Sequence, residues 1–328
     1  MNRFEWMDAA SVKEAVAQLN GRNGRAVVKA GGVDLLDRLK EGLEAPEQLV
    51  NIRNIRGLDQ IEEDKNGLRI GPLVTLARLS EDKLLLERYT ALALAAGRAA
   101  TPQIRNMATV GGNLLQRPRC WYFRQEEFNC RRKGGERCFA LDGENQYHAI
   151  FDNKLCPIVH PSALAVPLMA MGARVVLTHS RDTREVALER FFLTPEEDIR
   201  RENIIAPDEL MTEVQIPALQ PGTRSAYIKQ GEKESFDWPV ADVAVVLQTK
   251  GNVCLKASIV LGAAAPVPRR ASRAETALAG KVINEQSARE AARLCMEGAT
   301  PLAQNGYKLP IFEAIVRRAI LKAVSSGR

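Results

Sequence analysis

The feature that most constrains this chain is a set of four cysteines between residues 120 and 156. They follow closely behind a glycine pair at residues 111 and 112. Thiolates are the soft ligands that iron–sulfur clusters and zinc select, and four per site is the usual number for either. The stretch therefore predicts a metal centre. Its ligands would be Cys120, Cys130, Cys138 and Cys156.

The spacing of these cysteines leaves the identity of the metal open. Nine, seven and seventeen residues separate them, without a C-x-x-C pair, so neither a bacterial ferredoxin pattern nor a zinc ribbon is present. Disulfides are the simpler alternative, but intracellular cysteines stay reduced and nothing else in the chain is typical of secretion. His148 and His160 are alternative zinc ligands, although a histidine packed beside a turn is more common. The other two cysteines, Cys254 and Cys295, are expected to be small buried hydrophobic residues.

Positive charge is concentrated in the same stretch. The whole chain has 46 basic and 40 acidic side chains, and a net charge of +6 does not by itself indicate nucleic acid. Between residues 117 and 137, however, seven basic residues face only three acids. Iron-bound thiolates carry negative charge, which a basic surrounding would offset; a solvated basic loop is the alternative. The basic residues are Arg117, Arg119, Arg124, Arg131, Arg132, Lys133 and Arg137.

Two glycine pairs lie where the backbone can approach a ligand. Residues 27–28 predict a short strand that leads into the first pair, at 31–32, and residues 33–40 have helical spacing. Such a pair lets backbone amides approach a phosphate, helped by the partial positive charge of the helix N-terminus. Each pair could also be a plain turn, and neither belongs to a G-x-G-x-x-G motif. The second pair, at 111–112, makes a binding site in this region the better interpretation.

The length of 328 residues predicts two or three domains. A Pro-Gly step at 221–222 marks a boundary, beyond which strands are followed by helices. The last helix, over 311–324, should pack on the C-terminal sheet through one apolar stripe. No apolar run reaches the roughly 18 residues of a membrane span, and no signal peptide is recognisable, so we expect a cytoplasmic protein. Export to the periplasm with a partner that carries the signal would leave no trace in this chain.

Several motifs give the chain a specific resemblance. They are KAGGVDLL at 29–36, NIRNIRGL at 51–58, IGPLVTLARL at 70–79, IRNMATVGGN at 104–113, QRPRCWYFR at 116–124, HPSA at 160–163, DELMTEVQIP at 208–217, SFDWPVADVAV at 235–245 and LGAAAPVPRRA at 261–271. Over nearly its whole length the chain resembles the FAD-binding subunit of the molybdenum hydroxylases, the xanthine dehydrogenase and carbon monoxide dehydrogenase family. It resembles most the branch with an additional 4Fe-4S cluster, as in the beta subunit of 4-hydroxybenzoyl-CoA reductase and the flavin subunit of periplasmic aldehyde oxidoreductases.

The resemblance implies an α+β fold, in which a two-subdomain FAD-binding fold of the vanillyl-alcohol-oxidase/PCMH type precedes a CO-dehydrogenase-flavoprotein-like C-terminal α+β domain. The implied parts are residues 1–57 and 58–220, the two FAD-binding subdomains, an iron–sulfur insertion at about 116–158, and residues 221–328, the C-terminal domain. FAD and a 4Fe-4S cluster are the implied cofactors, the cluster held by the four cysteines. The implied FAD contacts are Lys29, Ala30, Gly31, Gly32, Val33, Asp34, Leu35, Leu36, Thr101, Thr109, Val110, Gly111, Gly112, Asn113 and Lys229.

Two positions depart from the family pattern. The usual AGGTD reads AGGVD, with Val33, and the usual HPSD reads HPSA, with Ala163. An alanine cannot replace the hydrogen bonds of an aspartate. We therefore expect one polar contact to the cofactor to be missing at Ala163, or to be made by water or a neighbour.

The resemblance also implies partners. In this family a molybdopterin-binding large subunit handles the substrate, and a small 2Fe-2S subunit stands between it and the flavin. The chain would then be an oxidoreductase subunit without catalytic residues for the substrate, in a heterotrimer or a dimer of heterotrimers. It would pass electrons between these subunits and an external donor or acceptor, within an aromatic acyl-CoA reductase or an aldehyde- or xanthine-type dehydrogenase.

A function of another class remains open on the residues alone. Aromatic side chains are interleaved with arginines in the cysteine stretch, and together they could form a stacking surface for nucleic acid on a zinc-binding module. That interpretation leaves most of the chain without a role. The aromatic residues are Trp121, Tyr122, Phe123 and Phe128.

Overall fold

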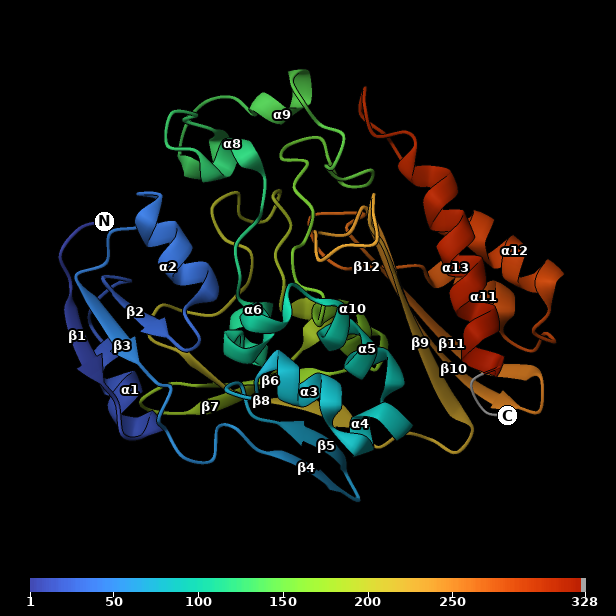
Figure 1. The fold of residues 1–328 in the computed structure, drawn as a ribbon, viewed down its shortest axis with the longest axis horizontal. Helices are drawn as coiled ribbons and strands as arrows, with labels where there is room; N and C mark the ends of the chain where they lie inside the picture. Colours follow the sequence, from blue (N-terminus) through green and yellow to red (C-terminus); the bar gives the residue numbers. More distant parts are fainter. Residues whose placement is uncertain (326–328) are drawn as a thin grey trace.

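The structure is a computed structural model that describes residues 1–325 (Figure 1). The first part of the chain forms a small parallel sheet in the order β1-β3-β2. Parallel strands need crossover connections, and two helices contribute to them. The elements are β1 (Glu5–Asp8), α1 (Val12–Leu19), β2 (Ala26–Lys29), α2 (Val33–Lys40) and β3 (Gln48–Asn51).

A second sheet, antiparallel, has the order β4-β5-β8-β6-β7. Between β5 and β6 the chain leaves this sheet to form a group of short helices and the cysteine stretch, then returns. The strands are β4 (Ile61–Asp64), β5 (Gly67–Ile70), β6 (Arg174–Thr178), β7 (Thr183–Ala187) and β8 (Leu210–Pro217). The helices between β5 and β6, apart from those of the cysteine stretch, are α3 (Leu76–Glu81), α4 (Lys83–Arg88), α5 (Thr90–Arg98), α6 (Pro102–Met107), α7 (Val110–Leu114) and α10 (Ala165–Ala170). The 3₁₀ turn η2 (Leu188–Arg190) follows β7.

The third sheet is antiparallel in the order β12-β11-β10-β9. As the sequence predicts, the last helix packs on this sheet: Ile315 and Ile320 are buried, and Ile311 and Val324 are partly buried against the same core. Helices α5 and α10 contact strands of the sheet as well, so one core joins the second and third sheets. The elements are β9 (Thr223–Gln230), β10 (Ala241–Lys250), β11 (Val253–Gly262), β12 (Arg269–Arg270), α11 (Ser272–Leu278), α12 (Glu285–Cys295) and α13 (Lys308–Ser325).

Residues 116–158, which we call the insertion, stand above the sheets, and in the view of Figure 1 their helices α8 and α9 lie higher than α2. Their regular structure consists of single turns, α8 (Trp121–Arg124), η1 (Arg131–Lys133) and α9 (Phe139–Asp142). Trp121, Tyr122 and Phe128 take part in a cluster of edge-to-face ring contacts, and Phe123 is buried. These aromatic residues therefore pack inside the insertion, and do not form the exposed stacking surface that a nucleic-acid module would need.

Residue 220 lies between β8 and β9, where the chain passes from the second sheet to the third. None of the helices in residues 1–325 combines the length and hydropathy that a membrane span requires.

Candidate cofactor site and cysteine cluster

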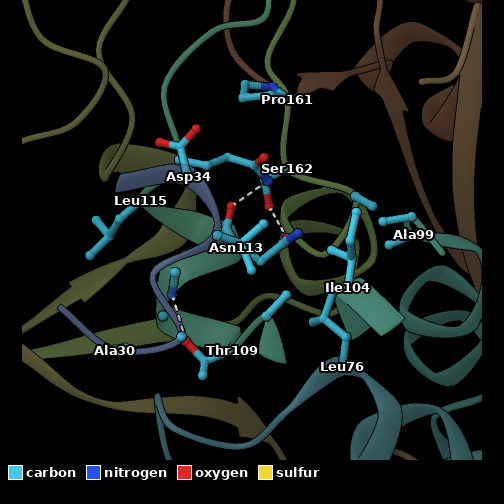
Figure 2. Close-up of a pocket in the computed structure, with 18 of the residues that line it drawn as sticks. Ala30, Asp34, Leu76, Ala99, Ile104, Thr109, Asn113, Leu115, Pro161 and Ser162 are labelled. Carbon is cyan, nitrogen blue, oxygen red and sulfur yellow. Dashed lines mark hydrogen bonds between the residues drawn. The ribbon is translucent and has the colours of Figure 1, made fainter. Parts of the chain in front are cut away.

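A cavity of about 520 Å³ opens where the three sheets meet. Its walls come from the loop before α2, the α7 turn, the segment after the insertion and the ends of β9 and β10. Figure 2 shows Ala30 and Thr109 on one side of it and Ser162, Ile104 and Ala99 on the other. The lining thus combines residues that lie far apart in the sequence.

The first glycine turn enters the cavity directly. Gly32 has φ +79°, a left-handed conformation that glycine adopts without strain, and it precedes α2 without any side-chain cap. The first amides of a helix have no partner within the helix, so the start of α2 offers donors and partial positive charge to a ligand. Gly31 lies against the neighbouring loop: a Cβ there would stand 1.9 Å from the Met107 carbonyl oxygen. Glycine is required at this contact.

The second glycine turn differs, because its amides are already used. Gly111 N donates to Pro72 O at 2.9 Å, Gly112 N to Thr109 Oγ1 at 3.2 Å, and Asn113 N to Thr109 O at 2.8 Å. A Cβ on Gly111 would lie 2.9 Å from Pro72 Cβ. This turn therefore shapes the wall of the cavity, and its amides are not free donors for a pyrophosphate.

The side chain of Asn113 joins this turn to the segment after the insertion (Figure 2). Its Oδ1 accepts from Ser162 Oγ at 2.7 Å and from Leu164 N at 3.2 Å. His160 is buried edge-on against Phe192, with ring centroids 4.2 Å apart, and burial lowers its pKa to about 3. It is thus a neutral packed histidine beside a turn, as the sequence favours. Ala163 lines the cavity.

The opposite wall combines the predicted contact Lys229 with a polar residue that the sequence did not single out, Asp242. Asp242 is fully buried, accepts a hydrogen bond from Tyr227 Oη at 2.9 Å, and has a pKa raised to about 7 by burial. Lys229 donates to the Arg98 carbonyl at 3.1 Å. Asp242 lies within the SFDWPVADVAV motif, so the sequence did show an acid in an apolar strand. It did not show that Tyr227, on the adjacent strand, is the partner of this acid. Phe236 and Trp238 of the same motif are exposed at the cavity rim.

Most of the predicted FAD contacts line this cavity, and three do not. Lys29 stands over the Trp6 ring, with Nζ 5.1 Å from the centroid, Leu36 is partly buried against another core, and Val110 is fully buried. These three residues are neighbours of lining residues in the sequence but do not line the cavity themselves. The predicted residues that line the cavity are Ala30, Gly31, Gly32, Val33, Asp34, Leu35, Thr101, Thr109, Gly111, Gly112, Asn113 and Lys229.

The four predicted metal ligands, the cysteines of the insertion, lie near one another. Cys138 and Cys156 are hydrogen-bond partners, and Cys120 lies within electrostatic range of Cys130 and Cys156. Burial raises the pKa of Cys120 to about 12, whereas the hydrogen bond from Cys138 lowers the pKa of Cys156 against the effect of burial. All six cysteines are free thiols, and Cys254 and Cys295 are buried elsewhere.

The arrangement differs from the coordination shell of one ion. Within residues 1–325, no three His, Cys, Asp or Glu side chains stand close enough to ligate a single metal. Four sulfurs around one zinc would lie about 3.8 Å apart, from a Zn–S bond of about 2.3 Å. Cysteines of a 4Fe-4S cluster each bind a different iron, so their sulfurs stand further apart, and the hydrogen-bonded pair Cys138 and Cys156 would have to separate to bind one. His148 has its Nε2 3.3 Å from Cys120 Sγ, but burial lowers its pKa to about 4 and its Nδ1 has no partner in the described residues.

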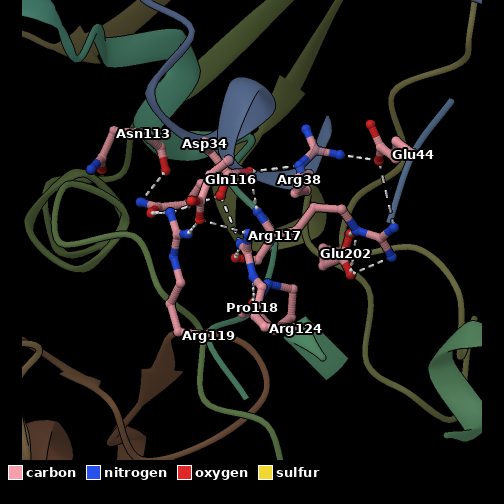
Figure 3. A network of polar contacts seen from close by, with 11 residues as sticks. Asp34, Arg38, Glu44, Asn113, Gln116, Arg117, Pro118, Arg119, Arg124 and Glu202 are labelled. Atoms are coloured by element: carbon pink, nitrogen blue, oxygen red, sulfur yellow. Dashed lines mark hydrogen bonds and ion pairs between the residues drawn. The ribbon is translucent and has the colours of Figure 1, made fainter. Parts of the chain in front are cut away.

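Arginines connect the insertion to the cavity (Figure 3). Asp34, which lines the cavity, pairs with Arg119 and Arg124 of the insertion, each at 2.7 Å, and with Arg38 at 3.0 Å. Burial alone would raise the pKa of Asp34, but the charges of the three arginines outweigh it and lower the pKa. The basic stretch is therefore largely a paired network in this region, and a single carboxylate belongs to both sites.

Comparison with known proteins identifies this architecture. Residues 2–219 match the family described as FAD binding domain in molybdopterin dehydrogenase, and residues 226–323 match the CO dehydrogenase flavoprotein C-terminal domain. The chain belongs to this family. The aldehyde oxidoreductase FAD-binding subunit PaoB of Escherichia coli (strain K12) is 32% identical over 91% of this chain and 90% of its own. The carbon monoxide dehydrogenase medium chain of Hydrogenophaga pseudoflava is 30% identical over 97% and 96%.

Solved structures of the family have the same fold. A carbon monoxide dehydrogenase chain from Hydrogenophaga pseudoflava superposes with a TM-score of 0.77 at 28% identity, covering 99% of this chain and 98% of its own. A chain of reconstituted CO dehydrogenase from Oligotropha carboxidovorans gives 0.79 at 25% identity, with the same coverage. The predicted fold class is confirmed. The protein is the FAD-binding subunit of an oxidoreductase complex of the molybdenum hydroxylase type.

Proposed function

We propose that this chain is an electron-transfer subunit that holds FAD in the cavity and a 4Fe-4S cluster in the insertion. The observation that carries the proposal is the convergence of four thiols beside a cavity whose walls belong to an FAD-binding family. FAD exchanges one or two electrons and a cluster one at a time, so together they can join a two-electron reaction to a one-electron chain.

In this proposal the two glycine turns contact different sides of FAD. The uncapped start of α2, from Gly31 to Asp34, supplies amides to the pyrophosphate. Thr101 and the Thr109–Asn113 turn form the facing wall, and Asn113 fixes Ser162 and Leu164 beside it. Lys229 and Asp242 supply the polar groups of the third wall.

The fit to a cluster rests on three features of the insertion. Four buried or half-buried thiols crowd together without disulfides. Burial raises the pKa of Cys120, and the hydrogen bond with Cys156 together with burial raises the pKa of Cys138; a cationic iron centre would oppose both effects. Arginines supply positive charge around them, with Arg132 next to Cys156. These features support the proposal that the chain belongs to a cluster-bearing branch of the family like the beta subunit of 4-hydroxybenzoyl-CoA reductase; zinc is the alternative occupant.

The chain needs partners to complete an enzyme. Apart from the insertion it has only Cys254 and Cys295, both buried in cores, so it offers no thiol ligands for a 2Fe-2S cluster. We therefore propose a heterotrimer, or a dimer of heterotrimers, with a molybdopterin-binding large subunit and a small 2Fe-2S subunit. The substrate, an aldehyde, a purine or an aromatic acyl-CoA, would bind the large subunit. We propose a cytoplasmic location unless a partner carries an export signal.

The test is to replace Cys130 by serine and measure iron and FAD in the purified protein. The parent should contain about four irons per chain. The Cys130→Ser variant should lose iron and the broad visible absorbance of the cluster, while FAD remains. Cys254→Ser is the matched control, since Cys254 is also buried but lies in the C-terminal core, and its iron content should equal that of the parent. Stoichiometric zinc in the parent, or iron that survives the loss of Cys130, would refute the cluster.

A further inference from the structure

Asp242 is a buried acid on the wall of the cavity with one hydrogen bond to its carboxyl group. The residue is 2% exposed, yet it lines the cavity. Within residues 1–325 the donor to this group is Tyr227 Oη, 2.9 Å from Oδ2. The other oxygen, Oδ1, is therefore available to a ligand in the cavity. A buried carboxylate that is not paired with a cation is costly, and it lowers this cost by binding a proton.

Three neighbouring strands form the place in which this acid lies. Asp242 of β10 stands opposite Lys229 of β9 and opposite Gly262 of β11. Residues opposite one another share one face of a sheet, and Tyr227, two positions before Lys229, lies on the same face. A Cβ on Gly262 would stand 2.3 Å from Asp242 Oδ1, so a glycine is needed to leave room for the carboxyl group. The position is thus shaped to hold an acid.

The cations around Asp242 come from three elements, and their own donors are used on main-chain carbonyls. Lys229 of β9 donates to the carbonyl of Arg98, at the end of α5, at 3.1 Å. Lys308 of α13 donates to two carbonyls, at 2.6 and 3.0 Å. Arg98 acts on Tyr227 by its charge. Burial raises the pKa of Asp242 to about 7, although the hydrogen bond from Tyr227 and the charges of the two lysines oppose it.

We propose that Asp242 is the proton site of the cavity, and that its Oδ1 takes up one proton from solvent when the cofactor bound there is reduced. This inference rests on the proposed function, because it requires FAD in the cavity. Two electrons delivered by iron–sulfur centres add negative charge to the flavin, part of which its own protons neutralise. The remaining charge favours the protonated form of a neighbouring carboxyl group, so an O–H bond forms at Asp242. Re-oxidation removes both electrons and returns the proton to solvent.

The experiment measures the midpoint potential of FAD over a series of pH values, by titrating the purified complex with dithionite and following the flavin absorbance. Below about pH 7 Asp242 is protonated in both redox states, and above that value only the reduced state should hold its proton. One extra proton per two electrons changes the equilibrium constant of reduction tenfold per pH unit, which is about 30 mV. In the parent this dependence should add to that of the flavin itself, beginning near neutral pH and ending where the reduced state also loses the proton.

Two variants change this dependence in different ways. Asp242→Asn keeps the shape and can still accept from Tyr227, but it binds no proton, so the extra dependence should disappear. Tyr227→Phe removes a donor that favours the charged carboxylate, so the extra dependence should move to higher pH. The infrared spectrum of the reduced minus the oxidised complex should show a new protonated carboxyl group in the parent and none in Asp242→Asn.

Glu209→Gln is the matched control. Glu209 also lines the cavity, but its two oxygens accept from Arg184 at 2.6 and 2.8 Å, and this pairing lowers its pKa. It stays charged in both redox states, so the variant should keep the pH dependence of the parent. If Asp242→Asn purifies without FAD, Tyr227→Phe decides, and an unmoved pH range overturns the inference. A parent with the same pH dependence as Asp242→Asn overturns this inference alone, whereas a parent without FAD overturns the proposed function.

Discussion

The cavity and the insertion are held in place by different kinds of contact. The cavity is walled by segments that lie far apart in the sequence, and main-chain contacts such as Gly111 N to Pro72 O help to hold its turns in place. The insertion has only single helical turns, and buried thiols, rings and arginine ion pairs hold it. Backbone walls are a property of the whole fold, which this chain shares with its relatives. The insertion depends on particular side chains, and for that reason should respond to single substitutions more locally.

The two regions are nevertheless not independent. Asp34 lines the cavity and pairs with two arginines of the insertion. On the other side, Lys308 of α13 is buried and donates to the His148 carbonyl at 3.0 Å. The insertion therefore contacts both the segment of the first sheet and the C-terminal helices. It is not the separate loop that its position in the sequence suggests. We expect cluster and flavin to be separable only by changes that spare Asp34.

The largest effect is expected from Gly31→Ala, which breaks the cavity and spares the insertion. The new Cβ would stand 1.9 Å from the Met107 carbonyl oxygen, and because both groups are backbone, neither can move alone. Overpacking of this kind costs on the order of 3 kcal/mol, which would weaken FAD binding roughly 100-fold. FAD affinity is measured by fluorescence titration of the protein after its flavin has been removed, and iron is measured in parallel.

Gly97→Ala is the control for this substitution. Gly97 lies within α5, where a Cβ would meet Ser80 Cβ at an ordinary 3.4 Å, and alanine favours a helix. Its FAD affinity should equal that of the parent. Full FAD affinity in Gly31→Ala would show that the first turn is not part of the site, and loss of iron there would show that the two regions fail together.

Sequence and structure agree best where the signal is local. The strand, glycine pair and helix around residues 31–32 could be predicted because strand propensity, Gly32 at positive φ and helical spacing all act within a few residues. The prediction of a site at the four cysteines rests on the number and chemistry of the thiols and on the family resemblance. The state of the second glycine turn could not be predicted, because its amide partner Pro72 lies 39 positions earlier than Gly111. An aspartate placed there at position 111 would first collide with Pro72, so it tests packing as much as the cofactor.

The partners of the charged residues could not be predicted for the same reason, because they lie far away in the sequence. The basic stretch could equally have been a solvated loop, and only the fold brings Asp34 to Arg124, 90 positions away. Asp242 is buried against Tyr227 through the pairing of β9 with β10, a contact that no periodicity encodes. Non-local polar partners are thus the part of the site that the structure adds.

A smaller effect, shared by both regions, is expected from Asp34→Asn. The substitution keeps the shape but leaves Arg38, Arg119 and Arg124 without their common carboxylate, which costs on the order of 3 kcal/mol for a largely buried group. Because folding lowers the pKa of Asp34, this contribution is present above its unfolded value of about 3.8 and is lost as the pH falls below it. The melting temperature at pH 7 should fall, and FAD and iron should be lost together on mild heating.

Asp37→Asn is the matched control, since Asp37 meets Arg119 and Arg124 at 3.5 and 3.4 Å but its side chain is 48% exposed. Exposed pairs contribute about 0–1 kcal/mol, so its melting temperature should stay close to that of the parent. Equal melting temperatures for the parent and Asp34→Asn, or loss of only one cofactor, would contradict the role of Asp34 as the link between the regions.

The smallest effect concerns the cavity alone, at Ala163. The position lines the cavity next to Ser162, which Asn113 holds in place, and the resemblance to the family implies an aspartate there. Ala163→Asp should restore one hydrogen bond to FAD, a gain of about 0.5–1.5 kcal/mol or roughly two- to tenfold in affinity. Ala163→Val, which adds volume without an acceptor, should not tighten binding. Iron content and the potential of the cluster should be the same in all three proteins, because Ala163 touches the cavity and not the arginine network. An affinity for FAD that does not change on Ala163→Asp would place the cofactor away from this wall.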